Sequence, residues 1–158
     1  MVSGQSAEVL LVEDSAFDAE LTLLAFDHLR ASDRVHVVSD GEEALEYIFA
    51  VGRYGDRTGR LPKVVLLDLK MPRVDGFEVL HLIKSDPRTR HVPVILLTSS
   101  AQEHDVSRGY ALGANSFVVK PVDFSAFAEA VRELGTYWLH LNQDPSGDGG
   151  GSQPDGRP

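Results

Sequence analysis

Four short, mainly apolar segments of the sequence end in polar residues whose side chains could carry out chemistry together. The segments are EVLLVE at 8–13, KVVLLD at 63–68, PVILLT at 93–98 and NSFVV at 115–119. The polar residues at or directly after their ends are Glu13, Asp14, Asp68, Thr98 and Lys120. Carboxylates that share a small cleft raise one another's pKa values unless a cation lies between them. Carboxylate oxygens suit Mg²⁺, so we expect a magnesium site where these residues meet.

An aspartate beside a divalent cation, a lysine and a small hydroxyl group has the parts needed for phosphoryl transfer. The carboxylate would be the nucleophile, as in enzymes that form an aspartyl phosphate. The cation and the ammonium group would neutralise charge on the phosphoryl oxygens. Taken singly, each residue has an ordinary explanation, since an Asp at a strand end is usually a turn or cap residue. Their occurrence together at one edge of a sheet favours the chemical interpretation.

The elements that position these residues alternate between strands and helices. RVHVVS at 34–39 adds a fifth strand, and helices are predicted over about 16–30, 42–49, 103–112 and 124–141, with another around Phe77, Leu80 and Ile83. Ser15 is the predicted N-cap of the first helix, with Asp18 three residues later. Continuously apolar strands indicate a parallel sheet covered on both faces. The alternation therefore predicts a doubly wound α/β fold with its ligand site at the carboxyl ends of the strands.

Composition excludes several classes of protein. The 158 residues suit one domain, and we expect an extension at 1–7, a folded domain at 8–143 and a disordered Gly/Pro-rich tail at 144–158. The net charge of −9 disfavours binding to nucleic acid or to anionic membranes. There is no cysteine, and neither a spanning apolar segment nor a secretory signal is evident. We therefore expect a cytoplasmic protein.

Five motifs in order resemble the receiver domains of two-component response regulators, over about residues 8–141. They are VEDS at 12–15, LLDLKMPRVDG at 66–76, LLTSS at 96–100, GAN at 113–115 and KPV at 120–122. The resemblance implies a flavodoxin-like five-stranded parallel sheet with strand order 2-1-3-4-5. It also implies that the protein accepts a phosphoryl group from a histidine kinase and signals through protein contacts, without being an enzyme in its own right.

The resemblance assigns roles to individual residues. Asp68 is the expected phosphoacceptor, and Lys120 is expected to pair first with its carboxylate and then with the phosphoryl group. Mg²⁺ is expected to bind Glu13, Asp14, Asp68 and the backbone carbonyl of Lys70.

Two further residues are expected to respond to phosphorylation. Thr98 matches the switch hydroxyl, and Phe117 matches the switch aromatic residue that rotates. The bond between Lys120 and Pro121 resembles one that is cis in the family.

The loop at 51–62 and its surroundings indicate a subfamily. The segments at 47–72 and 83–100 are similar to those of stand-alone receivers paired with phytochrome-type photoreceptor histidine kinases, and only the short tail follows the last helix. Within the loop, Arg53, Arg57 and Arg60 could meet an acidic partner, anchor the loop locally or belong to a solvated insertion.

The final predicted helix suggests self-association. Phe127, Val131, Leu134, Trp138 and Leu141 form one apolar stripe, while Phe124, Tyr137 and Leu139 lie off it. We expect a homodimer through the face formed by the fourth helix, fifth strand and fifth helix. The alternative is that Trp138 packs over its own domain.

Other functions stay open at this stage. The protein could be a phosphorelay intermediate or a phosphate sink for a kinase that is not a photoreceptor. A Mg²⁺-dependent phosphatase with an aspartyl nucleophile needs a second acid two residues later, where this chain has Lys70. A flavin-binding domain of the same topology needs a phosphate-binding loop after the first strand, where this chain has Glu13 and Asp14.

Overall fold

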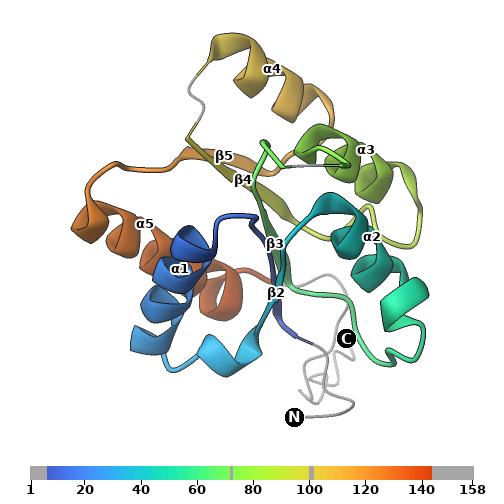
Figure 1. The fold of residues 1–158 in the computed structure, drawn as a ribbon, viewed down its shortest axis with the longest axis horizontal. Helices are drawn as coiled ribbons and strands as arrows, with labels where there is room; N and C mark the ends of the chain where they lie inside the picture. The colour runs from blue at the N-terminus through green and yellow to red at the C-terminus, as the bar shows by residue number, and fades with distance from the viewer. Residues whose placement is uncertain (1–6, 72, 100–101, 144–158) are drawn as a thin grey trace, which may run out of the picture.

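The computed structural model describes residues 7–71, 73–99 and 102–143, which form one parallel sheet between two layers of helices (Figure 1). The five strands lie in the order β2-β1-β3-β4-β5 and all pair in parallel, as predicted. In chain order the elements are β1 (Val9–Val12), α1 (Ala16–His28), β2 (Val35–Val38), α2 (Gly41–Phe49), β3 (Val64–Leu67), α3 (Gly76–Ser85), β4 (Val94–Thr98), α4 (Glu103–Ala111), β5 (Ser116–Val119) and α5 (Phe124–Thr136).

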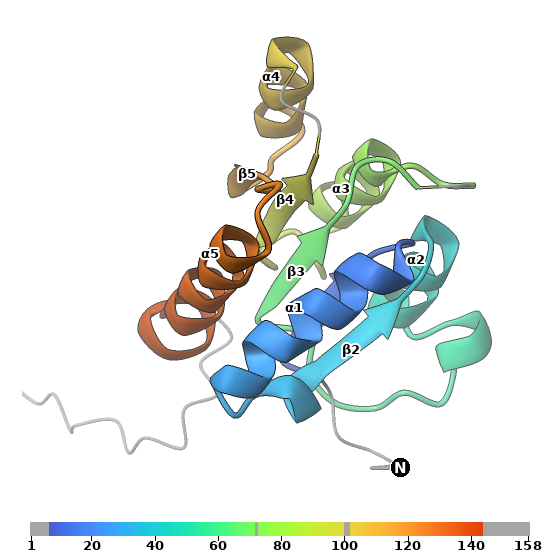
Figure 2. The same ribbon diagram turned by 60° about the vertical axis from the view of Figure 1, so that its left-hand side comes forward.

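Alternate residues of the central strands enter two separate cores, which explains why these strands are apolar throughout. Leu10 and Val12 of β1 pack in the core beneath α2 and α3. Val9 and Leu11 pack in the core beneath α1 and α5 on the opposite face. Figure 2 shows α1 and α5 together on one side of the sheet. The sheet edge that carries the polar residues is therefore supported by buried side chains on both faces.

The helices α1 and α5 pack closely against each other. Ser15 caps α1 by accepting a hydrogen bond from the Asp18 amide at 3.2 Å, as the sequence predicted. Phe26 on α1 is buried, and a β-carbon added to Gly135 of α5 would lie 3.0 Å from its ring. The absence of a side chain at Gly135 thus allows the close approach of the two helices.

The other end of the sheet is packed more loosely. Gly109 is the only fully buried residue among those of α4, and no residue of the edge strand β5 is fully buried. A β-carbon on Gly109 would lie 2.7 Å from Leu96 and 3.3 Å from Phe117. Contact between α4 and the sheet therefore depends on this small residue.

The end of the last helix differs from the prediction. The α-helix stops at Thr136 and continues as a π-helical turn over Tyr137–Leu141, closed by the Asn142 amide on the Tyr137 carbonyl at 2.7 Å. The wider turn changes which side chains face the core, so Leu139 is buried and Leu141 is exposed. Trp138 packs against the core of its own domain, as the alternative interpretation held.

The loop at 51–62 is anchored locally through two of its arginines, while most of its residues are exposed. The Arg57 guanidinium donates to the carbonyls of Tyr47 and Ile48 at 2.7 and 3.1 Å, and it lies over the Tyr47 ring. Arg53 pairs with Glu46 at 2.7 Å. These contacts engage two of the arginines for which an acidic partner was considered.

Several other expectations are resolved or lie outside the described part. The described residues include no cis peptide bond, so the expectation for Lys120–Pro121 is wrong; the two isomers of such a bond differ little in energy, and local packing decides. The tail at 144–158 and most of the extension at 1–7 lie outside the described residues. Among the described helices, none combines the length and the hydropathy required to cross a membrane.

Candidate functional site

The predicted site residues meet at the carboxyl edge of the sheet. Glu13 and Asp14 follow β1, Asp68 follows β3, Thr98 ends β4 and Lys120 follows β5. The ladder extends to this edge, since the Asp68 amide donates to Val12 at 3.1 Å and the Lys120 amide donates to Thr98 at 2.7 Å. Strand pairing thus places residues from four strands beside one another.

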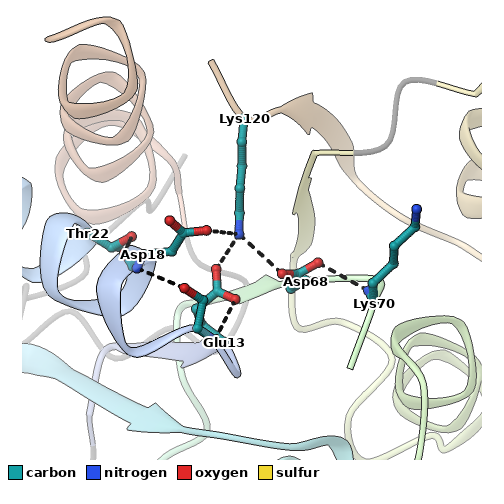
Figure 3. Close-up of polar contacts among 7 residues, drawn as sticks. Glu13, Asp18, Thr22, Asp68, Lys70 and Lys120 are labelled. Atoms are coloured by element: carbon teal, nitrogen blue, oxygen red, sulfur yellow. Dashed lines mark hydrogen bonds and ion pairs between the residues drawn. The ribbon is translucent and has the colours of Figure 1, made fainter. Parts of the chain in front are cut away.

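The Lys120 ammonium group lies at the centre of the site, surrounded by three carboxylates (Figure 3). It donates to Asp68 Oδ2 at 3.1 Å, to Asp18 Oδ2 at 2.9 Å and to Glu13 Oε1. Its side chain is only 8% exposed. A buried ammonium group needs such partners, because an unpaired charge away from water is very costly.

Burial and crowding shift the pKa values of two of these groups. Burial, together with the neighbouring Asp68, raises the pKa of Glu13 to about 8 despite the nearby Lys120. Burial alone would lower the pKa of Lys120, but hydrogen bonds to Glu13 and Asp18 and the charge of Asp68 outweigh it and raise that pKa. The site therefore holds a charged Lys120 beside Glu13, whose ionisation is unfavourable unless a further positive charge is bound.

A second set of three carboxylates, which includes Asp14 in place of Asp18, suits a divalent cation. One oxygen from each of Glu13, Asp14 and Asp68 lies within 4.8 Å of the others, and the described residues include no other such group of acidic or histidine side chains. Oxygen-only ligands are the set that Mg²⁺ prefers. A cation bound there would relieve the cost of ionising Glu13.

The Asp68 carboxylate is held from both sides. Its Oδ1 atom accepts the Lys70 amide at 3.1 Å, while its Oδ2 atom accepts from Lys120. The Lys70 side chain extends away from the cluster (Figure 3). Lys70 thus orients Asp68 through its backbone, and its ammonium group takes no part in holding the carboxylate.

Thr98 and Phe117, the two residues expected to respond to phosphorylation, lie on the neighbouring strands β4 and β5. Thr98 is fully buried at the end of β4, where its carbonyl accepts the Lys120 amide. Phe117 pairs in register with Leu96, is half-buried and packs toward Gly109 of α4. Phe117 therefore connects β5 to α4.

Sequence reasoning missed Asp18 as a site residue. It was used only as a sign of the start of a helix, yet its carboxylate contacts Lys120. Its position in the first turn of the helix that follows Glu13 and Asp14 places it at the same edge of the sheet. That position was the available signal, although only the fold shows which way the side chain turns.

The comparisons with known proteins agree with this geometry. Residues 9–132 match the family model described as the response regulator receiver domain. The chain is 41% identical over 138 residues to the probable methanogenesis regulatory protein FilR2 of Methanothrix harundinacea, which covers 87% of this chain and 86% of that protein.

Two solved structures are similar over nearly their full length. The phosphorylated cyanobacterial phytochrome response regulator RcpA superposes with a TM-score of 0.82 and 33% identity, covering 89% of this chain and 99% of that one. The bacteriophytochrome response regulator AtBRR has 49% identity and a TM-score of 0.69, covering 88% and 99%. The chain belongs to the response regulator receiver family, and it resembles those members that are associated with phytochromes.

Proposed function

We propose that the protein receives a phosphoryl group from a histidine kinase on Asp68 and that the domain at 8–143 passes the signal on through protein contacts. The observation that carries this proposal is the fixed Asp68 carboxylate. Its oxygens are held by the Lys70 amide and the Lys120 ammonium group, beside two more carboxylates. This arrangement presents a nucleophile in a set orientation next to a cation.

The transfer step follows from this geometry. A carboxylate oxygen of Asp68 attacks the phosphorus of a phosphohistidine, and a P–O bond forms while the P–N bond breaks. The electron pair of the broken bond returns to the imidazole nitrogen of the kinase. Lys120, which already faces Asp68, donates to the phosphoryl oxygens and neutralises part of their charge.

Glu13, Asp14, Asp68 and the backbone carbonyl of Lys70 would hold Mg²⁺. The bound ion would neutralise charge on the phosphoryl group. The clustered carboxylate oxygens support this assignment, as does the raised pKa of Glu13.

Thr98 and Phe117 are proposed to transmit the change. Thr98 lies at the end of β4 beside Lys120, where its hydroxyl could donate to a phosphoryl oxygen. Phe117 contacts α4 through Gly109. Phosphorylation would then favour one of two arrangements of α4 and β5.

The proposed partner is a photoreceptor kinase of the bacteriophytochrome type in the cytoplasm. The similarity to RcpA and AtBRR supports this choice. The alternative is a kinase that is not a photoreceptor, for which this protein would be a phosphorelay intermediate or a phosphate sink.

Phosphoryl labelling tests the site directly. Incubation with acetyl phosphate and Mg²⁺ should modify the wild-type protein at a single position, detectable by intact-mass measurement. Asp68→Asn should remove the label, and Asp33→Asn, which makes the same exchange at an exposed position of a short 3-10 helix, should keep it. Label that persists in Asp68→Asn would contradict the proposal.

Transfer from purified kinases tests the partner. A phosphorylated bacteriophytochrome kinase should pass its label to this protein within seconds to minutes, faster than kinases of other sensor classes do. Equal or faster transfer from the other kinases would favour the alternative.

We also propose a homodimer through the face of α4, β5 and α5. Tyr110, Val119 and Tyr137 are exposed apolar or aromatic residues on these elements or on the turn that follows α5. Trp138 no longer supports the idea, because it packs on its own core. Sedimentation should give a dimer at tens of micromolar, and a monomer at that concentration would contradict it.

A further inference from the structure

We propose that Asp18 is the positioning residue for Lys120 and that it keeps the ammonium group directed at the phosphoryl group during transfer. This inference rests on the proposed phosphoacceptor function of Asp68. It is carried by the contact between Asp18 Oδ2 and Lys120 Nζ at 2.9 Å (Figure 3).

The other two partners of Lys120, Glu13 and Asp68, are also the residues proposed to bind the metal ion and the phosphoryl group. Its ammonium group has three protons, and it contacts Glu13, Asp18 and Asp68. Glu13 and Asp68 belong to the group of clustered oxygens that suits a metal ion, whereas Asp18 does not. Asp18 is therefore the contact that stays available when a cation engages Glu13 and a phosphoryl group modifies Asp68.

The start of α1 leaves the Asp18 carboxylate available for this contact. In a reciprocal capping box, the acid at the third helical position accepts from the amide of the N-cap residue. Here the Ser15 amide donates instead to Glu13 Oε2 at 3.3 Å, while Ser15 Oγ still accepts from the Asp18 amide. Glu13 thus accepts the Ser15 amide in place of Asp18, and the Asp18 side chain contacts Lys120 instead.

Asp18 is attached to a firmer element than Lys120 is. Its carbonyl accepts the Thr22 hydroxyl at 2.8 Å, and Thr22 is buried. Lys120 instead follows the edge strand β5, whose last residue, Val119, is exposed. A long, flexible lysine side chain loses substantial rotamer freedom when it is fixed. A contact from α1 offsets that loss before the phosphoryl group arrives.

The pair also lines a pocket at the starts of α1 and α5. Asp18 and Lys120 line a pocket of about 210 Å³ together with Phe17, Ser99 and Phe124. The ring centroids of Phe17 and Phe124 lie 5.6 Å apart, so the two rings connect the starts of α1 and α5 beside this pocket. The Asp18 side chain is 31% exposed, so its charge can be removed without leaving a buried cavity.

A double-mutant cycle tests the inference. Asp18→Asn should slow phosphoryl uptake from acetyl phosphate by about two- to fivefold, the range expected for one partly exposed ion pair. The same change in a Lys120→Met background should alter the slow remaining rate by less than about 1.5-fold, because the partner is gone. Asp18→Glu should recover part of the lost rate. The concentration of Mg²⁺ at half-maximal rate should stay within about twofold, since Asp18 is not a proposed ligand.

The matched control is Glu20→Gln, which removes the same charge from an exposed position on α1. It should label at the wild-type rate. Wild-type or faster labelling in Asp18→Asn would overturn the inference, as would an equal loss in the Lys120→Met background. Those results leave Asp68 as the acceptor, whereas a wild-type protein that is not labelled at Asp68 overturns the proposed function and this inference together.

Discussion

The two ends of the sheet differ in how firmly they hold the site. On one side, α1 carries Asp18 and buries Ala19, Thr22, Ala25 and Phe26 against α5 and the sheet. On the other side, α4 buries only Gly109 among its residues, and β5 forms an edge without a fully buried side chain. Lys120 joins the two, since it follows β5 and contacts Asp18 of α1.

This difference separates the part of the domain that would bind the metal ion and the phosphoryl group from the part that would change on phosphorylation. Local opening costs least where few apolar contacts are made, so α4 and β5 can shift while α1, β1 and β3 keep their arrangement. Glu13, Asp14 and Asp68 all belong to the firm part. We infer that the site is built on the well-packed part of the domain and that its signal is expressed on the loosely packed part.

Truncation of one aromatic residue on each side should show the largest difference. Phe26→Ala should lower the free energy of unfolding by about 3–5 kcal/mol, because it leaves a cavity between α1 and α5. Phe117→Ala should cost only about 1–2 kcal/mol, because its ring is half-buried. Urea unfolding followed by circular dichroism measures both. Equal losses would break the comparison.

Phosphorylation should change hydrogen exchange on one side only. Amides of α4 and β5 should change their exchange rates by about tenfold on labelling with acetyl phosphate and Mg²⁺, and those of α1 and α5 by less than about twofold. Thr98→Ala should keep the label but reduce the change in α4. A response spread evenly over both sides would contradict the assignment of Thr98 and Phe117 as switch residues.

The stability of the metal-free protein should depend on pH through Glu13. Folding raises its pKa from 4.5 to about 8, so the folded state binds more protons than the unfolded state between these values. Stability is therefore greatest below the lower value and declines as pH rises through the upper one, so the Tm of the metal-free protein should fall over this range. Scanning fluorimetry in EDTA at pH 5 to 8.5 measures this decline.

Two comparisons isolate the Glu13 contribution. Mg²⁺ should reduce the decline by stabilising the ionised carboxylate, and Glu13→Gln should remove most of it. A Tm that rises over this pH range in EDTA would show that another group controls stability.

A change on the loosely packed face should have the smallest effect. Val119→Thr keeps the shape of the side chain at an exposed position of β5. It should alter the free energy of unfolding by no more than about 0.5 kcal/mol. A loss comparable to that of Phe26→Ala would mean that β5 is as firmly packed as the central strands.

Much of the fold and the site followed from local patterns. The short, continuously apolar segments predicted a sheet buried on both faces, and Val9 to Val12 do alternate between the two cores. Glu13, Asp68 and Lys120 were placed at one edge because parallel strands bring their carboxyl ends together. These features depend on periodicity and chain direction, which a single sequence records.

Other features depended on packing between distant segments. The stripe that ended in Leu141 assumed a regular α-helix, but a π-helical turn exposes Leu141 and buries Leu139. The sequence left open what Arg57 contacts, and only the fold brings it to the carbonyls of Tyr47 and Ile48.

The order of the elements, the edge at which the carboxylates gather and the chemistry that their types allow could all be predicted from the amino-acid sequence. The contact between Asp18 and Lys120 depends on the packed fold, because the two lie 102 residues apart and no local pattern links them. Side-chain direction at a helix start depends on which neighbour takes the cap amide, and here Glu13 takes it. The polar residues at the strand ends are thus a property of local sequence, and the network that orients them is a property of the packed fold.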